Sequence, residues 1–273
     1  MTDLLVIGGG AAGLMAAGAA CARGLTVTVL EHNPKGPGQK LLITGKGRCN
    51  VTSDSDVREF LPYVRHNGRF LYSSLYAFPP SAAMELFESL GVPLKTERGE
   101  RVFPASDKAS DVTNTLAREL ERLGVEVKLN ARVASLLCEG GRASGVELEG
   151  GERLTADAVV LATGGLSYPS TGSTGDGLRI AEETGHALTA RLPALVPIET
   201  VETWPGALSG LSLRNVKLFA YVAGGKKEKR IFAEQGELLF THFGISGPLV
   251  LTLSSLLPED LSRVRLAIDL KPA

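Results

Sequence analysis

The sequence predicts an α/β fold with a parallel sheet, followed by a mainly antiparallel β region. An apolar segment, residues 4–7, leads through the glycine-rich residues 8–13 into an Ala-rich segment of helical character. A second apolar segment, residues 25–30, then ends at Glu31 and completes a strand–helix–strand unit. From residue 193 onward, short strand-like segments follow one another, which is typical of an antiparallel sheet.

The three glycines of the motif Gly8-x-Gly10-x-x-Gly13 each have a separate task. Gly8 permits a tight turn, Gly10 lets a diphosphate approach the backbone, and Gly13 lets the helix lie close to the strand. The helix begins at Ala11 and Ala12, and the free N–H groups at its start are expected to face a negative charge. The motif therefore predicts a dinucleotide site.

Glu31 is the acidic residue that such a site needs at the end of its second strand. Its carboxylate can accept hydrogen bonds from both hydroxyls of an adenosine ribose, and it would repel a 2′-phosphate. We include the neighbouring His32 among the candidate binding residues.

The composition excludes several classes of protein. The 29 basic and 30 acidic residues give a net charge of -1, so no global field favours nucleic acid or an anionic membrane. Cys21, Cys49 and Cys138 form no CxxC pair, which argues against a disulfide framework and against a metal site. Residues 4–22 are uncharged, but Asp3 precedes them and five glycines interrupt them, so we expect a cytoplasmic protein without a signal peptide or membrane span.

Residues 39–52 form a basic segment interrupted by glycines. Lys40, Lys46 and Arg48 bring positive charge close to the expected diphosphate, and Gly45 lets the backbone approach a planar ligand. We predict ligand contact here; the alternative is a solvated basic loop.

Residues 53–110 break the alternation of strands and helices. Residues 57–64 and 82–90 show helical periodicity. Between them, residues 69–78 carry four aromatic side chains. They are predicted to form a small helical core, with an aromatic substrate cage as the alternative.

The regular pattern then returns. We expect a hairpin over residues 92–103, a helix over residues 112–123 with Asp111 as its N-cap, and an antiparallel meander over residues 131–148. Residues 158–161 are predicted to be a second fully buried parallel strand.

This strand leads into Thr163 and Gly164, which a parallel strand would deliver to the ligand crevice at the carboxyl edge of the sheet. Residues 167–177 then combine small hydroxyl side chains with glycines before a helix. Gly175 and Asp176 are predicted to contact the ligand there. In the alternative interpretation the stretch is an N-cap loop, and Asp176 serves only as its capping acid.

The last part of the chain is predicted to be an antiparallel unit with a hairpin tip at residues 224–227 and a helix over residues 249–257. Its expected strands are residues 196–201, 215–223, 229–234, 237–241 and 264–270. His242 is a weak candidate for a catalytic acid or base because histidine titrates near neutrality. The alternative is a loop histidine that stabilises its turn.

Four blocks of sequence together resemble a known family. They are VIGGGAAGLMAA at 6–17, QKLLITGKGRCNVT at 39–52, ATGGLSYPSTGSTGDG at 162–177 and GELLFTHFGISGP at 236–248. The combination resembles the HI0933-like flavoprotein family, a group of NAD(P)/FAD-dependent oxidoreductases that includes aminoacetone-oxidase-like proteins. The third block is also similar to segments of fumarate reductase and succinate dehydrogenase flavoproteins.

The resemblance implies an FAD cofactor and indicates which part of FAD each residue would contact. The residues that it places at the diphosphate and ribose are Gly8, Gly10, Ala11, Ala12, Gly13, Glu31 and His32. Those that it places along the diphosphate and flavin are Lys40, Thr44, Gly45, Arg48, Cys49 and Asn50. Val133 would meet the adenine through its backbone, Thr163 and Gly164 would close the nucleotide end, and Gly175 and Asp176 would lie near the flavin or its ribityl chain. A small buried thiol is the alternative role for Cys49.

The resemblance also implies the domain organisation. Residues 1–192 would be a Rossmann-like FAD-binding domain with a helical excursion at 53–110, and residues 193–273 an inserted β-rich domain. Members of the family continue further and return to the FAD domain, so we expect a chain truncated at its C-terminus, with an incomplete inserted domain.

We therefore predict a flavoprotein oxidoreductase that moves hydride or electrons between a small organic substrate or NAD(P)H and an acceptor. No second glycine motif with a ribose acid is present, so NAD(P)H would bind only transiently. The alternatives are a non-catalytic flavin-binding or RNA-associated protein and a dehydrogenase that uses nicotinamide alone. We expect a small-molecule substrate and neither nucleic acid nor membrane as partner, and the sequence makes no prediction of oligomeric state.

Overall fold

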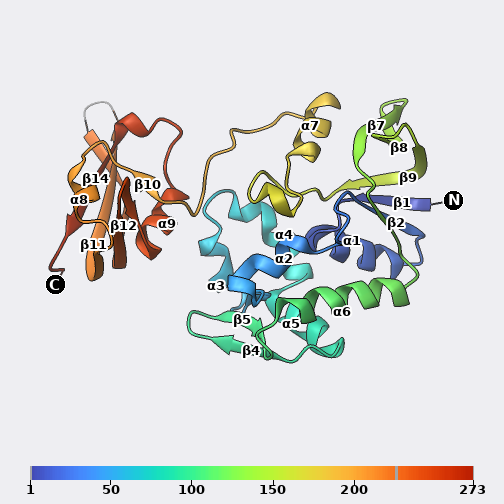
Figure 1. Cartoon of the computed structure of the whole chain (residues 1–273), viewed down its shortest axis with the longest axis horizontal. Coiled ribbons are helices and arrows are strands. Elements are labelled where there is room, and N and C mark those ends of the chain that lie inside the picture. The colour runs from blue at the N-terminus through green and yellow to red at the C-terminus, as the bar shows by residue number, and fades with distance from the viewer. Residues whose placement is uncertain (1, 225–226, 273) are drawn as a thin grey trace. The chain divides into compact units, whose positions relative to one another are not determined.

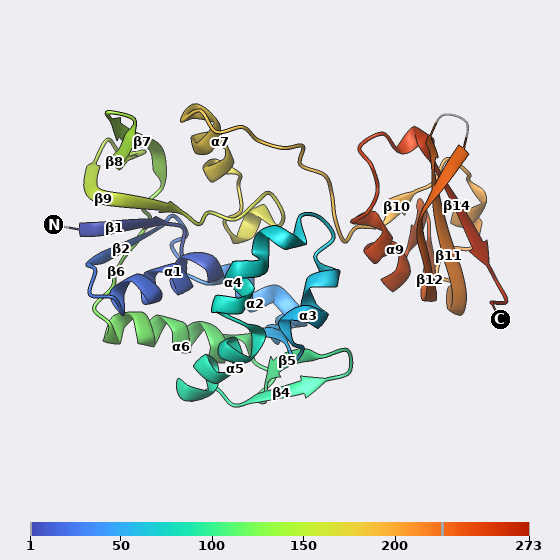
Figure 2. The ribbon, with the colours of Figure 1, turned by 180° about the vertical axis from the view of Figure 1, so that it is seen from behind.

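The computed structural model describes residues 2–224 and 227–272. The chain divides into two units, the first extending to Leu188 and the second beginning at Thr189. Figure 1 shows the elements of both units, and Figure 2 shows them from behind.

The first unit is organised around a six-stranded sheet with the order β6-β2-β1-β9-β8-β7. Its strands are β1 Thr2–Ile7, β2 Val27–Glu31, β6 Glu126–Leu129, β7 Val133–Glu139, β8 Arg142–Leu148 and β9 Arg153–Leu161. Strand β1 pairs in parallel with β2 and β9, and β2 pairs in parallel with β6. The meander β7-β8-β9 adds an antiparallel edge. The predicted parallel sheet is confirmed.

Alternate residues of β1 build the two halves of the core. Val6 packs on one face with Leu14 of helix α1 (Ala11–Cys21) and Leu116 of helix α6 (Ala109–Arg122). Leu5 packs on the other face, in a cluster that includes Ile180 of helix α7 (Asp176–Glu183). A strand buried on both faces reads as a continuous apolar run, which explains the run at residues 4–7.

The excursion between β2 and α6 consists of short elements. These are α2 Gln39–Ile43, η1 Thr44–Gly47, β3 Thr52–Ser53, α3 Val57–Phe60, η2 Leu61–Tyr63, η3 Gly68–Leu71, α4 Tyr72–Ala77, α5 Pro80–Ser89, β4 Leu94–Glu97 and β5 Arg101–Pro104. The aromatic segment 69–78 is helical as predicted, but the prediction of a small core there is wrong. Phe70 is 85% exposed, and Tyr72, Tyr76 and Phe78 are exposed as well. Their side chains face solvent because these helices are too short to present one continuous apolar stripe.

Two further local predictions are wrong. Helix α6 begins at Ala109, with Lys108 at its N-cap, so Asp111 lies inside the first turn rather than at the cap. Strand β9 is not fully buried, because Leu161 at its carboxyl end is 37% exposed and lines a cavity.

The second unit is a five-stranded antiparallel sheet with the order β10-β13-β12-β11-β14. Its elements are β10 Ile198–Glu199, α8 Trp204–Ala207, β11 Ser212–Gly224, β12 Lys227–Thr241, β13 Gly244–Ser246, α9 Pro248–Ser254, η5 Leu261–Arg263 and β14 Val264–Asp269. The expected strands 229–234 and 237–241 are one continuous strand, although its pairing with β11 shifts register next to Gly236. Gly236 lies beneath Leu249 of α9. At the expected hairpin tip, Gly225 and Lys226 lie outside the described residues.

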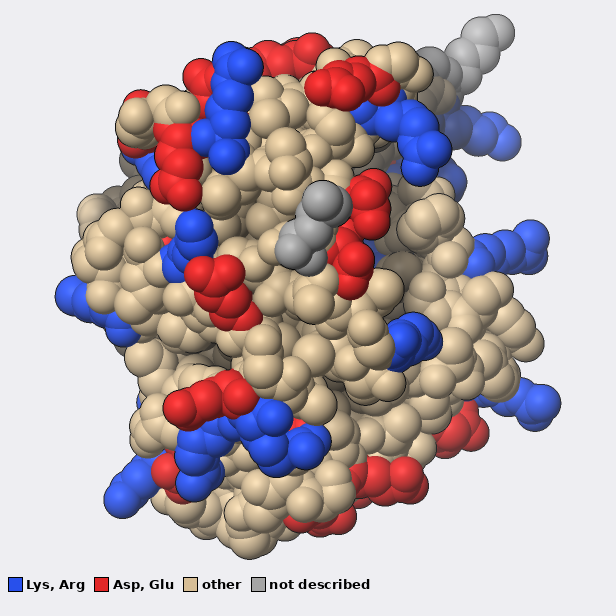
Figure 3. Space-filling model, turned by 90° about the vertical axis from the view of Figure 1, so that its right-hand side faces the viewer, with Lys and Arg blue, Asp and Glu red and all other residues tan. Residues whose placement is uncertain are grey.

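The surface carries charges of both signs. On the face that Figure 3 shows, Asp and Glu side chains lie among those of Lys and Arg. Of the helices in residues 2–224 and 227–272, none combines the length and the apolar character that crossing a membrane requires.

Candidate functional site

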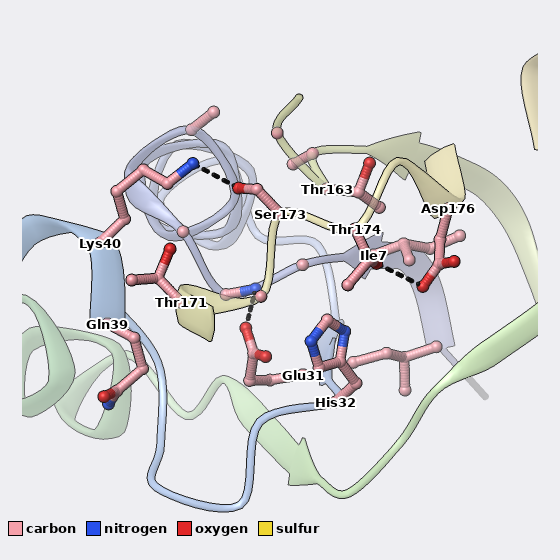
Figure 4. A pocket seen from close by; sticks show the side chains of 18 of the residues that line it. Ile7, Glu31, His32, Gln39, Lys40, Thr163, Thr171, Ser173, Thr174 and Asp176 are labelled. Carbon is pink, nitrogen blue, oxygen red and sulfur yellow. Dashed lines mark hydrogen bonds between the residues drawn. The ribbon is translucent and has the colours of Figure 1, made fainter. Parts of the chain in front are cut away.

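A cavity of about 580 Å³ opens at the carboxyl ends of β1, β2 and β9. In an open parallel sheet this edge is where ligands bind, and the volume is in the usual range for a ligand pocket. Predicted residues that line it are Gly8, Gly10, Ala11, Ala12, Glu31, His32, Lys40, Thr44, Val133, Thr163, Gly164 and Asp176. The first unit thus brings most of the predicted site together (Figure 4).

The glycine motif has the geometry that its spacing predicts. Gly8 has a φ of +102°, and a Cβ there would lie 2.7 Å from the carbonyl oxygen of Ala162. A Cβ on Gly13 would lie 1.9 Å from the carbonyl oxygen of Gly8, so only glycine lets α1 approach the turn this closely. A Cβ on Gly10 would meet nothing within 4 Å, because it would point into open space. Gly8 and Gly13 therefore allow close packing of the backbone, and Gly10 leaves room for a ligand.

The N-terminus of α1 faces the cavity, and its own first turn provides no anion. Gly10 is the N-cap and provides no side chain, and the first turn contains no acidic residue. Ala11 and Ala12 are exposed and line the cavity. The first N–H groups of a helix carry partial positive charge, so this end is suited to a diphosphate.

Glu31 forms one wall of the cavity, and its side chain is held by two backbone groups. It is only 8% exposed. The N–H of Gly9 donates to Oε2 at 2.8 Å, and the N–H of Asn33 donates to Oε1 at 2.7 Å. Each carboxylate oxygen can accept a further hydrogen bond, so both remain available to ribose hydroxyls. Gly9 was not among the predicted residues, although a Cβ there would lie 2.9 Å from Oε2.

Lys40 joins helix α2 to the loop that follows β9. Its Nζ donates to the carbonyl oxygen of Ser167 at 2.7 Å and to Oγ of Ser173. Figure 4 shows this contact across the cavity from Glu31. The result is a fixed positive charge beside the buried hydroxyl of Ser173. Ser173 was not singled out among the small hydroxyls of 167–177, although that stretch was predicted to bind.

The other end of the cavity is closed by an ion pair. Arg132 donates to both carboxylate oxygens of Asp176, at 3.1 and 3.2 Å, and Thr174 donates to the same carboxylate at 2.9 Å. The Arg132 guanidinium holds the pKa of Asp176 below its ordinary value. Asp176 is the first residue of α7, and the N-cap is Gly175, so the capping alternative is wrong. Arg132 was missed, and its position directly before Val133 is the only signal that could have suggested it.

Thr163 and Gly164 lie where β9 leaves the sheet. A Cβ on Gly177 would lie 2.0 Å from Oγ1 of Thr163, so the start of α7 packs directly on this threonine. Gly164 has a φ of +74° and lies next to Ser173. These contacts fix the loop with its hydroxyl side chains at the rim of the cavity.

Several predicted residues do not line this cavity: Gly13, Gly45, Arg48, Cys49, Asn50 and Gly175. Arg48 pairs instead with Glu97 at 2.8 Å and lies 4.0 Å over the ring of Phe103. Cys49 is 1% exposed, and burial raises the pKa of its thiol. Of the three basic residues in 39–52, only Lys40 reaches the cavity.

His242 belongs to the second unit, in the turn between β12 and β13. Its ring packs edge-on against Phe243, with ring centroids 4.8 Å apart. Among residues 2–224 and 227–272, no group of His, Cys, Asp and Glu could hold a metal ion.

Comparison with known proteins identifies the family. The model of the HI0933-like protein Rossmann domain matches residues 2–245. The chain belongs to the HI0933-like family. This is a family of flavoprotein oxidoreductases, so the resemblance seen in the four sequence blocks is confirmed.

Curated relatives of this HI0933-like chain include two kinds of enzyme. It is 32% identical to the 3-dehydro-bile acid delta(4,6)-reductase of Clostridium scindens over 100% of this chain and 65% of that protein. It is also 32% identical to the ribosomal RNA dihydrouridine synthase of Escherichia coli over 93% of this chain and 60% of that protein. The chain thus spans 60% to 65% of the length of these relatives.

Solved structures support the fold of this HI0933-like chain. The open conformation of a flavocytochrome c3 fumarate reductase matches with a TM-score of 0.59 and 23% identity, over 78% of this chain and 47% of that one. A 3-ketosteroid-delta4-(5alpha)-dehydrogenase from Rhodococcus jostii, solved with 4-androstene-3,17-dione, matches with a TM-score of 0.54 and 18% identity, over 78% of this chain and 59% of that one.

Proposed function

We propose that this chain binds FAD in the cavity of its first unit and forms part of an oxidoreductase that reduces a carbon–carbon double bond. The observation that carries the proposal is the open space at Gly10, between the uncapped start of α1 and the carboxylate of Glu31. A diphosphate fits the first group and a ribose diol fits the second. When bound, FAD supplies the hydride transfer, which no protein side chain can provide.

The chain's own residues have distinct tasks in this proposal. Glu31 accepts hydrogen bonds from the ribose, and its negative charge disfavours a 2′-phosphate. Lys40 contributes positive charge near the diphosphate and ties down the loop through Ser173. The Arg132–Asp176 pair lies beside the backbone of Val133, at the proposed adenine end. We therefore propose this end for Asp176, in place of the flavin end that the family resemblance implied.

The substrate class follows from what the relatives' names have in common. One is named as a reductase of a bile-acid double bond, and the other for making dihydrouridine in ribosomal RNA. Both names describe the addition of two hydrogen atoms to an unsaturated ring. We therefore propose an acceptor in which the double bond is conjugated to a carbonyl group, such as a cyclic enone or a uracil ring, with NAD(P)H as a transient hydride donor.

A ligand titration tests the cofactor proposal. The purified chain is titrated with FAD, FMN and NADPH, and binding is followed by flavin fluorescence or by calorimetry. FAD should bind at one site, and FMN should bind more weakly because it lacks the adenosine that Glu31 and Val133 contact. Binding of NADPH in preference to FAD, or no binding of FAD, would overturn the proposal.

The cellular setting is proposed on the basis of the thiols. Cys21, Cys49 and Cys138 are all unpaired. Unpaired thiols are typical of reducing compartments, which supports a cytoplasmic protein.

A further inference from the structure

The sheet of the second unit has an edge strand, β14, that the proposed flavin chemistry does not use. Strand β14 pairs with β11 through every residue from Val264 to Asp269, without a register shift. On its other side, β14 has no neighbouring strand among the described residues. A regular strand without a bulge or a proline presents a row of unpaired N–H and C=O groups, and such an edge is suited to pairing with another strand.

One face of β14 is apolar and borders a cavity. Leu266 and Ile268 pack against the apolar cluster of the second unit. Together with Leu270 they line a cavity of about 670 Å³. Leu270 is 69% exposed, and Trp204 and Leu261 of the same cavity are exposed as well. Exposed apolar side chains that gather in this way are typical of a surface that binds a partner.

The opposite face of β14 carries one charge of each sign. Side chains alternate along a strand, so Arg265 and Asp269 lie on the face away from Leu266. The guanidinium of Arg265 lies 4.6 Å from the ring centroid of Tyr221. Its Nε and Nη2 donate to the carboxylate of Glu228, at 3.1 and 2.6 Å. Since Nη1 takes no part in these bonds, Arg265 is oriented and still has a donor for a second carboxylate.

The sequence of β14 is complementary to itself when two copies run antiparallel. With a two-fold axis at Ala267, Arg265 of one copy lies opposite Asp269 of the other, and this pair occurs twice. On the apolar face, Leu266 lies opposite Ile268, again twice. Moving the axis to the next residue on either side breaks the match of charges. One register therefore places opposite charges together on one face and apolar side chains together on the other.

We propose that β14 pairs antiparallel with β14 of a second copy of this chain and so forms a symmetric dimer. Pairing joins the two sheets into one, and the apolar faces of both copies become continuous across the axis. Leu270 of each copy then lies next to Val264 of the other. Both copies contribute the same surface, as a closed two-fold interface requires. The proposal concerns the second unit and does not rest on FAD binding.

The mass of the 273-residue chain in solution tests the dimer. Sedimentation is measured from about 1 to 100 µM, and at the upper end an interaction of micromolar affinity is nearly complete. We expect a monomer–dimer equilibrium without larger species. A chain that is monomeric at every concentration, or that forms assemblies larger than a dimer, would overturn the proposal.

Hydrogen exchange locates the interface without any substitution. Amides of residues 264–270 should become more protected as the concentration rises, because pairing covers the edge of β14. Amides of β10, the strand at the other edge of the sheet, should not change. Protection that rises at β10 but not at β14 would contradict the assignment.

Two charge reversals test the register. Arg265→Asp places two carboxylates opposite each other, and Asp269→Arg places two guanidinium groups opposite each other. Each should raise the dissociation constant of the dimer by at least about 4-fold, because two pairs change from attraction to repulsion. An equimolar mixture of the two variants should pair again, since each copy then meets the opposite charge at both positions.

Glu199→Arg is the matched control, because Glu199 is an exposed acid on the other edge strand, β10, and its reversal should leave the dimer unchanged. Thermal melts check that each variant is folded, and exchange in the parent chain decides the case for any variant that is not. Unchanged dissociation constants in both reversed variants, a mixture of folded variants that stays monomeric, or an equal loss in Glu199→Arg would each overturn the proposal.

Discussion

Gly13 and Gly18 lie in the same helix, α1, yet the same substitution should affect them in opposite directions. A Cβ on Gly13 would lie 1.9 Å from the carbonyl oxygen of Gly8 and 3.3 Å from Cβ of Ala162. A Cβ on Gly18 would meet Cδ2 of Leu120 at 3.7 Å, an ordinary van der Waals contact. The pair therefore separates close packing from helix propensity.

The magnitudes follow from these distances. Gly18→Ala should raise the free energy of unfolding by about 0.5–1 kcal/mol, because alanine loses less backbone entropy in a helix than glycine does. Gly13→Ala gains the same contribution to the free energy of unfolding from helix propensity. However, the start of α1 must move by about 1 Å away from the carbonyl oxygen of Gly8, and overpacking of this kind costs roughly 1–3 kcal/mol or more. Gly13→Ala should therefore be clearly less stable than Gly18→Ala.

Denaturant unfolding of the parent chain and both variants measures the difference, with a fluorescence or circular dichroism signal assigned to the first unit. In thermal melts, 1 kcal/mol corresponds to a shift of about 2–4 °C for a unit of this size. Equal stability of the two variants, or a more stable Gly13→Ala, would contradict the close packing of α1 at Gly13 against the carbonyl oxygen of Gly8.

Two further predictions concern charge and thiols. Arg132 holds the folded-state pKa of Asp176 below its ordinary value of 3.8, so the stability that this pair contributes is present above the unfolded pKa and is lost as pH falls through the folded pKa. Asp176→Asn should cost about 0.2–1 kcal/mol of unfolding free energy at neutral pH and almost nothing in strong acid, and a constant cost across pH would contradict this. Among the thiols, exposed Cys138 should react quickly with iodoacetamide, whereas buried Cys49, whose pKa is raised, should react only on unfolding. Mass spectrometry of timed samples distinguishes the two cysteines. Equally fast modification of both would contradict the buried position of Cys49.

The nucleotide-binding part of the fold could be predicted because its signals are local. Gly13 and Glu31 act on groups within one strand–helix–strand unit, so their spacing fixes this part of the geometry locally. Gly8 makes its close approach to Ala162 instead, beyond the end of β9. The carboxyl-edge position of Thr163 followed from the parallel pairing of its strand. Such features depend on backbone rules that hold for many sequences.

The rest of the site depends on contacts between distant segments. Arg132 and Asp176 are 44 residues apart, and Lys40 and Ser173 are 133 apart, so no periodicity connects them. Arg48 was expected at the diphosphate because of its charge, but Glu97 and Phe103 hold it elsewhere. The sequence shows which side chains are charged, but the ion-pair partner of each one depends on the tertiary structure.

The aromatic segment 69–78 shows the same limit for burial. Four aromatic residues in ten predicted a core, yet Phe70 and its neighbours are exposed. In the second unit, two strands were expected at 229–234 and 237–241, whereas the structure has one strand in which Gly236 lies beneath Leu249. A glycine marks a turn or a close approach, and only tertiary structure decides which.

The most direct test of the account is the affinity for FAD after substitution of Gly10. A Cβ there meets nothing within 4 Å, so Gly10→Val should fold, with a melting temperature lower by only about 2–4 °C because valine is a poorer N-cap than glycine. If the diphosphate lies in this space, as we propose, the variant should lose FAD binding. Gly150→Val is the matched control, because a Cβ on Gly150 also meets nothing within 4 Å but lies outside the cavity, and it should bind FAD like the parent chain. Unchanged FAD affinity in a folded Gly10→Val variant would contradict the account.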